Sequence, residues 1–412
     1  MSENERKTLR YLAYRYKKAS EHPRNAKNAE LHRAVNSLRQ IRPVVLLNEI
    51  PFHELNYDEK LTIKCEDPFL RTVENKLRQT LFQWEHFPAD MIVPGWFSLQ
   101  KSITTTGIGV QVQEKILPLD LSNNIVAHEY HDQFSSDDDI EKLREPVIIY
   151  DRVTTQNQME ILMDIFGDIL PVKLEGYNSY VNTWDKISTY RGVEKLLVDL
   201  IDRPDFTHRL VRKLTDIEKS THRQYEEQGL FEIDTQQIHC TPALADELPA
   251  KDFRGRNARM KDVWGRGMAQ IFNSVSESMH NEFDIEYMID VMEPFGLVYY
   301  GCCEPLDKKL SVVKRIPNLR KISITPWADI ESAAEQIGKD YVLSAKPTPT
   351  AVAVKNLEED AVRKELKGIL SAVKRNNCNC DIVLKDISSA GYNLTNLVNW
   401  EKIAMEMASD FA

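Results

Sequence analysis

The chain has 412 residues, a formal net charge of −10 and a hydrophobic share of 42%. An acidic chain has no general affinity for nucleic acid or anionic lipid, so we expect no nucleic-acid partner and no membrane partner. No run of about 18 apolar residues is present, and the first residues lack an apolar signal segment, which predicts a soluble, cytoplasmic protein. Six cysteines are too few for a disulfide framework in so long a chain, so we expect reduced thiols.

Two charged segments at the start of the chain, residues 3–20 and 26–40, have a helical pattern. We interpret residues 1–42 as an N-terminal helical extension and residues 43–412 as a single domain. The first strand is predicted over Pro43–Glu49, and it delivers Asn48 and Glu49 at its end.

Short apolar runs with strand character then recur along the chain, at residues 91–93, 172–174, 236–238, 268–272, 297–300, 321–325, 341–345 and 381–384. Helix-like segments separate most of them, which is typical of βαβ units and a parallel sheet. With the first strand this makes nine candidates, one more than a TIM (β/α)8 barrel needs, so one of them must lie outside the barrel. The strand-end residues are Asn48, Trp96, Glu175, His239, Asn273, Cys302, Thr325, Lys346 and Asp386.

Residues 98–145 have weaker periodicity, and we interpret them as a long insertion that covers one end of the barrel. Within it, residues 107–113 alternate like a solvated hairpin strand. The fold class predicted from these patterns is therefore α/β, a TIM (β/α)8 barrel with a helical extension and an inserted covering segment.

Three segments resemble the uroporphyrinogen decarboxylase superfamily, which also contains corrinoid-dependent and coenzyme M methyltransferases and the barrel of cobalamin-independent methionine synthase. They are residues 202–215, residues 295–303 (Phe-Gly-Leu-Val-Tyr-Tyr-Gly-Cys-Cys), and residues 322–330 together with 345–349. The resemblance runs from about Pro43 to the C-terminus. It implies a barrel enzyme that carries N-terminal helices.

The decarboxylase branch of that superfamily grips substrate carboxylates with an arginine-rich motif at the first strand. Asn48 and Glu49 stand at that place here, and Glu49 would repel a porphyrinogen carboxylate. Gly95 and Trp96 stand where the branch has its catalytic aspartate. We therefore expect no porphyrinogen decarboxylation.

The methyltransferase branch holds zinc with a His-x-Cys pair at a strand end and a late cysteine, and the ion activates a thiol. Cys302 matches the first cysteine, whereas Tyr300 replaces the histidine and Ser388-Ser389 stand near the late cysteine. Only one of the three family ligands is therefore kept.

Several thiol, imidazole and carboxylate groups could still form a metal site of their own. Cys302, His239 and Glu304 are the predicted ligands, in a site left open for substrate. The alternatives are that Cys302 is an unreactive thiol and that Cys303 packs in the barrel wall. Cys302 and Cys303 could also form a disulfide with each other. Glu304 could instead lie in the first turn of a helix that begins at Pro305. Cys378 and Cys380 precede the last strand, at the face that serves stability, so we expect a structural role for them.

The other candidates are charged and aromatic groups at strand ends. Glu49, Lys346 and His239 are the predicted acid, base or anchoring groups, although Glu49 could instead form a salt bridge. Lys346 and Lys385-Asp386 also end strands, and they could bind an anionic substrate or form a buried ion pair across the mouth. Substrate-binding roles are also predicted for Asn48, Trp96, Trp264, Tyr300 and Trp327, with core filling as the alternative for each tryptophan.

Three functional hypotheses follow. The first is an enzyme that transfers a methyl group to or from a small substrate, with zinc as a cofactor and a corrinoid protein as a partner. The second is a metal-independent lyase or decarboxylase that acts on a non-porphyrin acid through Lys346, His239 and Glu49. The third is a barrel that binds a small ligand without catalysis. The sequence leaves the substrate open, and a homodimer is also left open.

Overall fold

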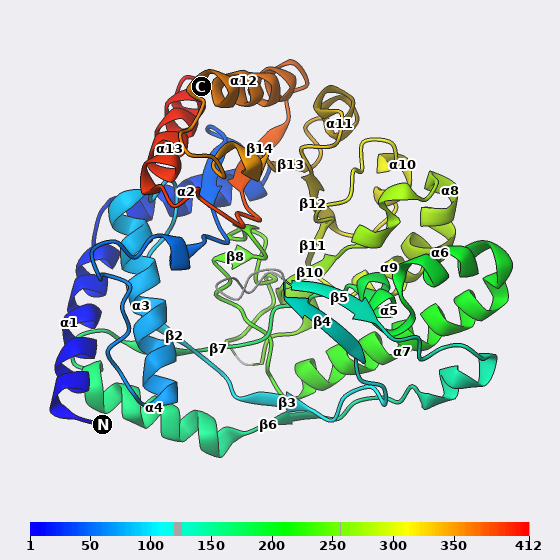
Figure 1. The fold of residues 1–412 in the computed structure, drawn as a ribbon, viewed down its shortest axis with the longest axis horizontal. Coiled ribbons are helices and arrows are strands. Elements are labelled where there is room, and N and C mark those ends of the chain that lie inside the picture. Colours follow the sequence, from blue (N-terminus) through cyan, green and yellow to red (C-terminus); the bar gives the residue numbers. More distant parts are fainter. Residues whose placement is uncertain (119–125, 256, 412) are drawn as a thin grey trace.

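Six parallel strands form the central sheet of this computed structural model, which describes residues 1–118, 126–255 and 257–411 (Figure 1). Each strand pairs with its neighbours in parallel. From one edge to the other they are β1 (Val44–Leu47), β14 (Asn379–Leu384), β13 (Val342–Ala345), β12 (Leu319–Ile324), β11 (Leu297–Tyr300) and β10 (Trp264–Gly267). The predicted α/β class with a parallel sheet is confirmed.

Two further parallel strands, β2 (Phe97–Gln100) and β7 (Val172–Glu175), pair only with each other. A single parallel bridge between Val181 and Gly267 links the segment after β7 to β10. Within the described residues no strand ladder joins this pair to the six-stranded sheet, so the hydrogen bonding does not close a barrel.

Helices surround the strands, with α1 and α3 side by side and α2 against β1 and β14 (Figure 1). The helices are α1 (Glu3–Ser20), α2 (Arg24–Asn36), α3 (Pro68–His86), α4 (Arg152–Phe166), α5 (Thr183–Arg191), α6 (Val193–Asp202), α7 (Pro204–Glu227), α8 (Glu277–His280), α9 (Glu286–Met292), α10 (Leu310–Val313), α11 (Ile330–Ile337), α12 (Glu359–Arg375) and α13 (Leu394–Ser409). The segments predicted to be helical near the N-terminus are occupied by α1 and α2.

The region predicted as an insertion contains short antiparallel ribbons. Strand β3 (Ile103–Thr105) pairs with β6 (Ile148–Tyr150), and β4 (Glu114–Pro118) pairs with β5 (Val126–Tyr130), which lies near α5. Residues 107–113 are not a strand, contrary to the prediction. Gly107 and Gly109 have φ angles of 76° and 89°, which interrupt an extended backbone between β3 and β4.

Three predicted barrel strands lie elsewhere. Residues 91–93 are not a strand, and β2 begins six residues later, after Pro94, which cannot donate to a ladder. Residues 236–238 contain β8 (Gln237–Ile238), but it pairs antiparallel with β9 (Thr241–Pro242), outside the parallel sheet. Residues 268–272 instead include part of a 3-10 helix, Gln270–Ser274, which holds Asn273.

Strand β10 lies a few residues earlier in the chain than the strand predicted at residues 268–272, and two glycines explain why. A Cβ atom at Gly265 would lie 2.8 Å from Met292 Sδ, and one at Gly267 would lie 2.5 Å from Met288 Sδ. Helix α9, which carries both methionines, therefore packs directly on the strand backbone. Glycines suggest a break in a strand when only the sequence is read, whereas here they allow the close approach.

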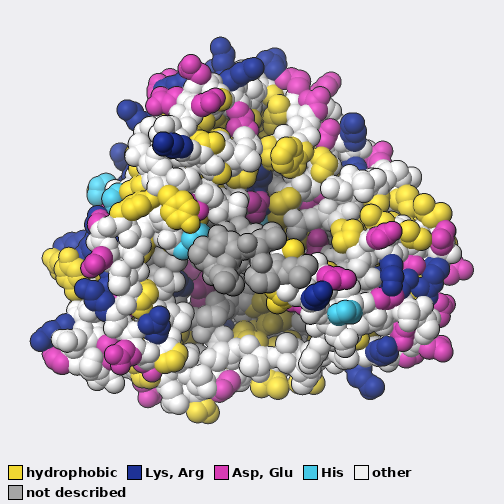
Figure 2. Space-filling model, viewed as in Figure 1, with side chains coloured by type: hydrophobic (Ala, Val, Ile, Leu, Met, Phe, Trp, Pro, Cys, Tyr) yellow, Lys and Arg dark blue, Asp and Glu magenta, His cyan; other side chains and the backbone are white. Residues whose placement is uncertain are grey.

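No helix in the described part of the chain is long and apolar enough to cross a membrane. On the face drawn in Figure 2, acidic and basic side chains are interspersed around the described surface.

Candidate functional site

The carboxyl ends of the parallel strands bring reactive groups from distant parts of the chain together. Glu49 follows β1, Cys302 follows β11 and Lys385 follows β14. Loops after parallel strands lie at one edge of a sheet, where ligands bind in α/β proteins. A direct contact joins two of these loops, because the backbone N–H of Asp386 donates to Glu49 Oε2 at 2.8 Å.

The β8–β9 hairpin carries His239 and Cys240 into the same region. Asn48 donates from Nδ2 to the Cys240 carbonyl at 2.6 Å, which connects the hairpin to the end of β1. Lys321 on β12 donates to the Pro242 carbonyl at 2.8 Å. The turn between the two short strands, where His239 has a φ of 46°, is therefore held at the strand ends although the hairpin is outside the sheet.

Three potential metal ligands converge at this turn. The ligand atoms of Glu49, His239 and Cys240 all lie within 4.8 Å of one another. The Cys240 thiol donates to Glu49 Oε1 at 3.2 Å, and His239 Nε2 is 3.4 Å from Cys302 Sγ. Carboxylate, imidazole and thiolate are all zinc ligands, so the donor set fits that ion.

The adjacent thiols Cys302 and Cys303 lie beside a lysine. Their sulfur atoms are 3.6 Å apart and not bonded, and Lys385 Nζ lies 3.6 Å from Cys302 Sγ and 3.4 Å from Cys303 Sγ. The hydrogen bond from Cys303, with further contributions from His239 and Lys385, lowers the pKa of Cys302, whereas the pKa of Cys303 is raised. The site therefore favours one thiolate and one thiol.

Lys385 is buried and its ammonium also contacts Asp386 Oδ2 at 2.5 Å. The Cys303 thiol donates to the same carboxylate oxygen at 3.3 Å. Lys385 and Asp386 therefore form an ion pair with each other, in which the aspartate is half exposed, and binding of an anionic substrate by these residues stays a prediction. That pair lies directly beside the two sulfur atoms.

Glu304 departs from the predicted ligand role. Its Oε2 accepts from the Cys302 backbone N–H at 2.9 Å and its Oε1 accepts from the Ala269 N–H at 3.2 Å, so both oxygens hold the loop. No helix begins at Pro305 either, because the next helix starts at Leu310. Burial and the nearby Glu304 charge raise the pKa of Asp185 to about 7.

Lys346 is buried near the hairpin. Its Nζ donates to Ser344 Oγ at 2.6 Å, and burial lowers its pKa to about 8. Deeper in the sheet, Lys321 and Asp381 form a fully buried ion pair at 2.8 Å. Thr241 of the hairpin donates to Asp381 Oδ2 at 3.0 Å, so this network also anchors the hairpin.

Two predicted substrate-binding aromatics do not line the site. The Tyr300 hydroxyl donates to Asp284 Oδ2 at 2.6 Å and lies 2.7 Å from His280 Nε2, so the side chain points into the helix layer. Trp327 is 74% exposed on the loop after β12. Side chains alternate between the two faces of a strand, and Tyr300 falls on the outer one.

The other two predicted tryptophans lie at the beginning of strands, not at their ends. Trp96 precedes β2, and Lys173 Nζ lies 3.7 Å from its ring. Trp264 begins β10, is buried, and donates from Nε1 to the Ala243 carbonyl at 2.7 Å. Trp264 therefore fixes the segment after the hairpin, as the core-filling alternative predicts. Cys378 and Cys380 are likewise buried at the amino end of β14.

Sequence reasoning missed Cys240 as a ligand candidate and missed Tyr180 and Arg266 altogether. Tyr180 stacks on His239 with ring centroids 6.3 Å apart, and Arg266 Cζ lies 4.3 Å from the Tyr180 ring. Cys240 adjoins His239 in the sequence, which was a usable signal. Arg266 lies between two glycines, in a segment without strand character.

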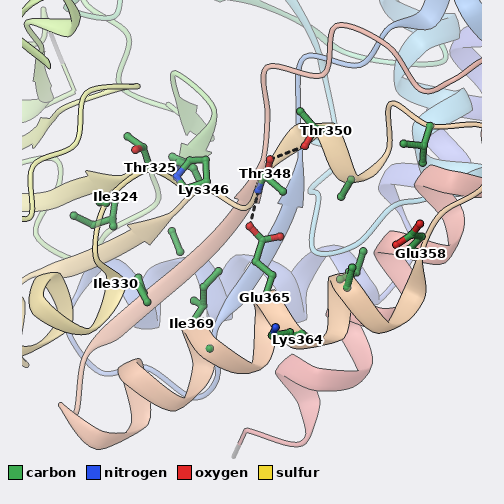
Figure 3. A pocket seen from close by; sticks show the side chains of 18 residues that line it. Ile324, Thr325, Ile330, Lys346, Thr348, Thr350, Glu358, Lys364, Glu365 and Ile369 are labelled. Atoms are coloured by element: carbon green, nitrogen blue, oxygen red, sulfur yellow. Dashed lines mark hydrogen bonds between the residues drawn. The ribbon is translucent and has the colours of Figure 1, made fainter.

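A cavity outside this cluster lies between the ends of β12 and β13 and helix α12 (Figure 3). It has a volume of about 700 Å³. Ile324, Val362 and Ile369 supply apolar walls, and Glu365 accepts from the Thr348 backbone N–H at 2.9 Å. Lys346 is the residue that this cavity shares with the groups described above.

No protein-family model matches the sequence, and no curated protein matches it either. Among solved structures, a methyltransferase from Methanosarcina mazei is similar, with a TM-score of 0.50, 13% identity, and coverage of 92% of this chain and 98% of that one. A B12-independent methionine synthase from Shewanella sp. W3-18-1, in complex with selenomethionine, has a TM-score of 0.35 and 12% identity, covering 74% of this chain and 77% of that one. The first likeness shows a shared fold. The second score is too low to carry an argument.

Proposed function

We propose that this protein is a methyltransferase-like enzyme of the uroporphyrinogen decarboxylase superfamily, acting on a small thiol-bearing or methylated substrate. The observation that carries the proposal is the convergence of Glu49, His239 and Cys240 within 4.8 Å, beside the thiols at the end of β11. The eight parallel strands, in two sets, would be the strands of one (β/α)8 barrel. The fold shared with the Methanosarcina mazei methyltransferase supports this assignment.

The metal in this proposal is zinc, held by Glu49, His239 and Cys240. Cys302 lies next to this set, 3.4 Å from His239 Nε2. When bound, the ion would stabilise a substrate thiolate at neutral pH. Glu49 takes the place of a family ligand, so the proposed set differs from the His, Cys and Cys of the methyltransferase branch.

The residues around the proposed metal stabilise negative charge on the thiols and position the ligands. Lys385 lies within 3.6 Å of both sulfur atoms, so its ammonium stabilises negative charge on either one. His239 Nε2 lies 3.4 Å from Cys302 Sγ, so the proposed ligand set adjoins the thiols. Asn48 holds the hairpin turn and thereby positions His239 and Cys240.

A corrinoid protein is the partner that we propose for the methyl group. Large apolar side chains are exposed on loops that follow strands of the sheet: Tyr57 (60%) after β1, Trp327 (74%) after β12 and Tyr392 (62%) after β14. Exposed aromatic groups are enriched where proteins associate. They follow carboxyl ends of strands, as the thiols do.

The test is methyl transfer from methylcobalamin to a panel of small thiols, followed by the change in cobalamin absorbance. We expect activity that requires zinc and falls at least about 100-fold in Glu49→Gln and in Cys240→Ser, because ligand loss removes the metal. Glu59→Gln, at an exposed position in the loop after β1, is the matched control and should retain activity. Metal-independent transfer that survives both ligand substitutions would contradict the proposal.

A second candidate is a metal-independent lyase, and the lowered pKa of Lys346, about 8, favours it. A lysine with that pKa can exchange protons near neutral pH. Activity on small organic acids that resists chelators and disappears in Lys346→Met would identify this function. Activity that chelators abolish would exclude it.

A further inference from the structure

Arg266, in the middle of β10, is a buried cation without an ion-pair partner among the described residues. The residue is 2% exposed, and within residues 1–118, 126–255 and 257–411 neither Nε nor Nη1 has a hydrogen-bond partner. In the same part of the chain, Nη2 donates only to Met268 Sδ, at 3.5 Å. A buried unpaired charge is strongly unfavourable, and an unsatisfied buried donor of this kind calls for a bound group that completes it.

Arg266 lies on the face of the sheet opposite to the helix layer reached by Tyr300. It is in register with Tyr299 on β11, which is in turn in register with Lys321 on β12. Lys321 contacts Asp381 on β14 across the intervening strand β13, so these side chains share the concave face. Arg266 therefore points into the space enclosed by the strands.

A second buried cation lies near the first. The Tyr299 ring has Arg266 Cζ at 5.6 Å and Lys346 Nζ at 6.0 Å from its centroid. The nearby carboxylate of Asp381 is already engaged by Lys321 at 2.8 Å and by Thr241 at 3.0 Å. Arg266 and Lys346 thus give this part of the concave face a positive charge that the described side chains leave without direct ion pairs.

Tyr180 connects Arg266 to the thiols. Its ring covers the guanidinium at 4.3 Å, stacks on His239, and belongs to a residue that is 38% exposed. His239 is in contact with Cys302. Tyr180 and His239 therefore form a continuous series of contacts between Arg266 and Cys302.

We propose that Arg266 and Lys346 form a subsite for the anionic end of a small organic acid, as a carboxylate, sulfonate or phosphonate, whose reacting end lies at Cys302 and His239. A planar guanidinium binds such groups through two parallel hydrogen bonds, and Nε and Nη1 are available for them. The inference deepens the proposed function by giving its substrate a negative charge, and it rests on that function for the reacting end alone. Binding of the anion requires no transfer chemistry.

The experiment is titration calorimetry at fixed ionic strength with butanoate, propane-1-sulfonate and propylphosphonate, each compared with neutral butanamide. We expect at least one anion to bind 10-fold or more tighter than butanamide, and Arg266→Met to weaken that anion at least 10-fold. Arg212→Met is the matched control, because Arg212 forms a surface ion pair with Asp290, and it should bind as the unsubstituted protein does. The anion that binds tightest identifies the acid class.

Equal affinity for anions and butanamide, or an Arg266→Met variant that binds anions unchanged, would overturn the subsite. Stability gives a second readout: without ligand, Arg266→Met should have a higher urea midpoint than the unsubstituted protein, because a buried unpaired charge is removed, and a lower midpoint would count against the proposal. Arg266→Lys keeps the positive charge but loses the planar guanidinium that forms two parallel hydrogen bonds, so it should bind the anion more weakly. Absent methyl transfer with intact anion binding would refute the proposed function but not the subsite.

Discussion

The chemistry of the site depends first on how Lys385 acts on the thiols. Its buried ammonium lies 3.6 Å from Cys302 Sγ, in a region where a charge interaction is less screened than in water. The Cys303 hydrogen bond, His239 and Lys385 together hold the pKa of Cys302 below its ordinary value. Cys302 should therefore be a thiolate under conditions in which an ordinary cysteine is protonated.

Replacing Lys385 with methionine should move the pH dependence of Cys302 alkylation in metal-free protein to higher pH. The ammonium is lost, so the pKa of Cys302 rises, and the rate profile moves by about one pH unit for each unit of pKa. Peptide mapping by mass spectrometry after timed iodoacetamide treatment measures the rate at Cys302. The difference between the two proteins should shrink at pH 9, where both are deprotonated.

Lys308→Met is the control, because Lys308 is exposed in the same segment as the thiols. It should leave the alkylation rate unchanged. A Lys385→Met protein whose alkylation rate has the same pH profile as that of the unsubstituted protein would show that the lysine does not act on Cys302.

The lowered pKa of Lys346 predicts that the free energy of unfolding depends on pH. Burial lowers its pKa to about 8 from the ordinary 10.5. Below pH 8 the lysine is charged in both states and its burial cost is fully present, whereas between pH 8 and 10.5 the unfolded chain binds more protons, so the fold gains stability as the pH rises. Lys346→Met should therefore be stabilised relative to the unsubstituted protein at pH 7, and this advantage should decrease by on the order of 3 kcal/mol towards pH 10.5.

Urea unfolding of both proteins across this pH range measures the effect, with Lys364→Met, at an exposed lysine on α12, as the control. The control should track the unsubstituted protein at every pH. Parallel stability curves for Lys346→Met and the unsubstituted protein would mean that Lys346 does not titrate in this range.

At the scale of elements, close packing of α9 on β10 shapes the site wall. Gly267→Ala should destabilise the protein by about 1–3 kcal/mol, because the added Cβ would meet Met288 Sδ at 2.5 Å and a packed wall resists an added methyl group. Gly368→Ala is the matched control in helix α12, where nothing lies within 4 Å of the added atom. It should stabilise the protein by about 0.5–1 kcal/mol, since alanine favours a helix.

Chemical denaturation measures both substitutions. Equal effects of the two would mean that the contact between α9 and β10 is not tight. A destabilised Gly267→Ala beside a stabilised Gly368→Ala supports the packing described here.

The sequence predicted the strands with long β-branched or apolar runs, such as β11 and β14, because burial on both faces leaves a continuous apolar pattern. It misplaced β10, whose residues Trp264–Gly267 include an arginine and two glycines that are accepted only because of the neighbouring helix and the buried face. Likewise, Gln236–Ile238 has a strand pattern, but tertiary contacts make it part of a hairpin. Local pattern does not contain such long-range contacts.

The candidate site was predictable in the same limited way. The sequence placed Glu49, Cys302, Lys385 and Asp386 at strand ends, and the structure brings their loops together. It assigned Glu304 as a ligand, because the sequence does not show that backbone amides occupy both carboxylate oxygens. It could not find Arg266, because only the folded structure shows that its Nε and Nη1 have no hydrogen-bond partner among the residues described.

For the whole molecule, the account depends on one arrangement: the loops after β1, β11 and β14 and the β8–β9 hairpin meet at a single point that can hold a metal beside a thiolate. Each contributor comes from a different part of the chain, so the site exists only in the folded protein. Metal binding should then add to the stability of the fold, because the unfolded chain lacks the site.

The most direct test is to load the metal-free protein with Co²⁺ and record its visible and near-ultraviolet absorption. The account predicts one equivalent bound in a tetrahedral site with a thiolate-to-cobalt charge-transfer band, and loss of that band in Cys240→Ser but not in Cys378→Ser. A protein that binds no cobalt, or that keeps the same spectrum in Cys240→Ser, would contradict the central claim.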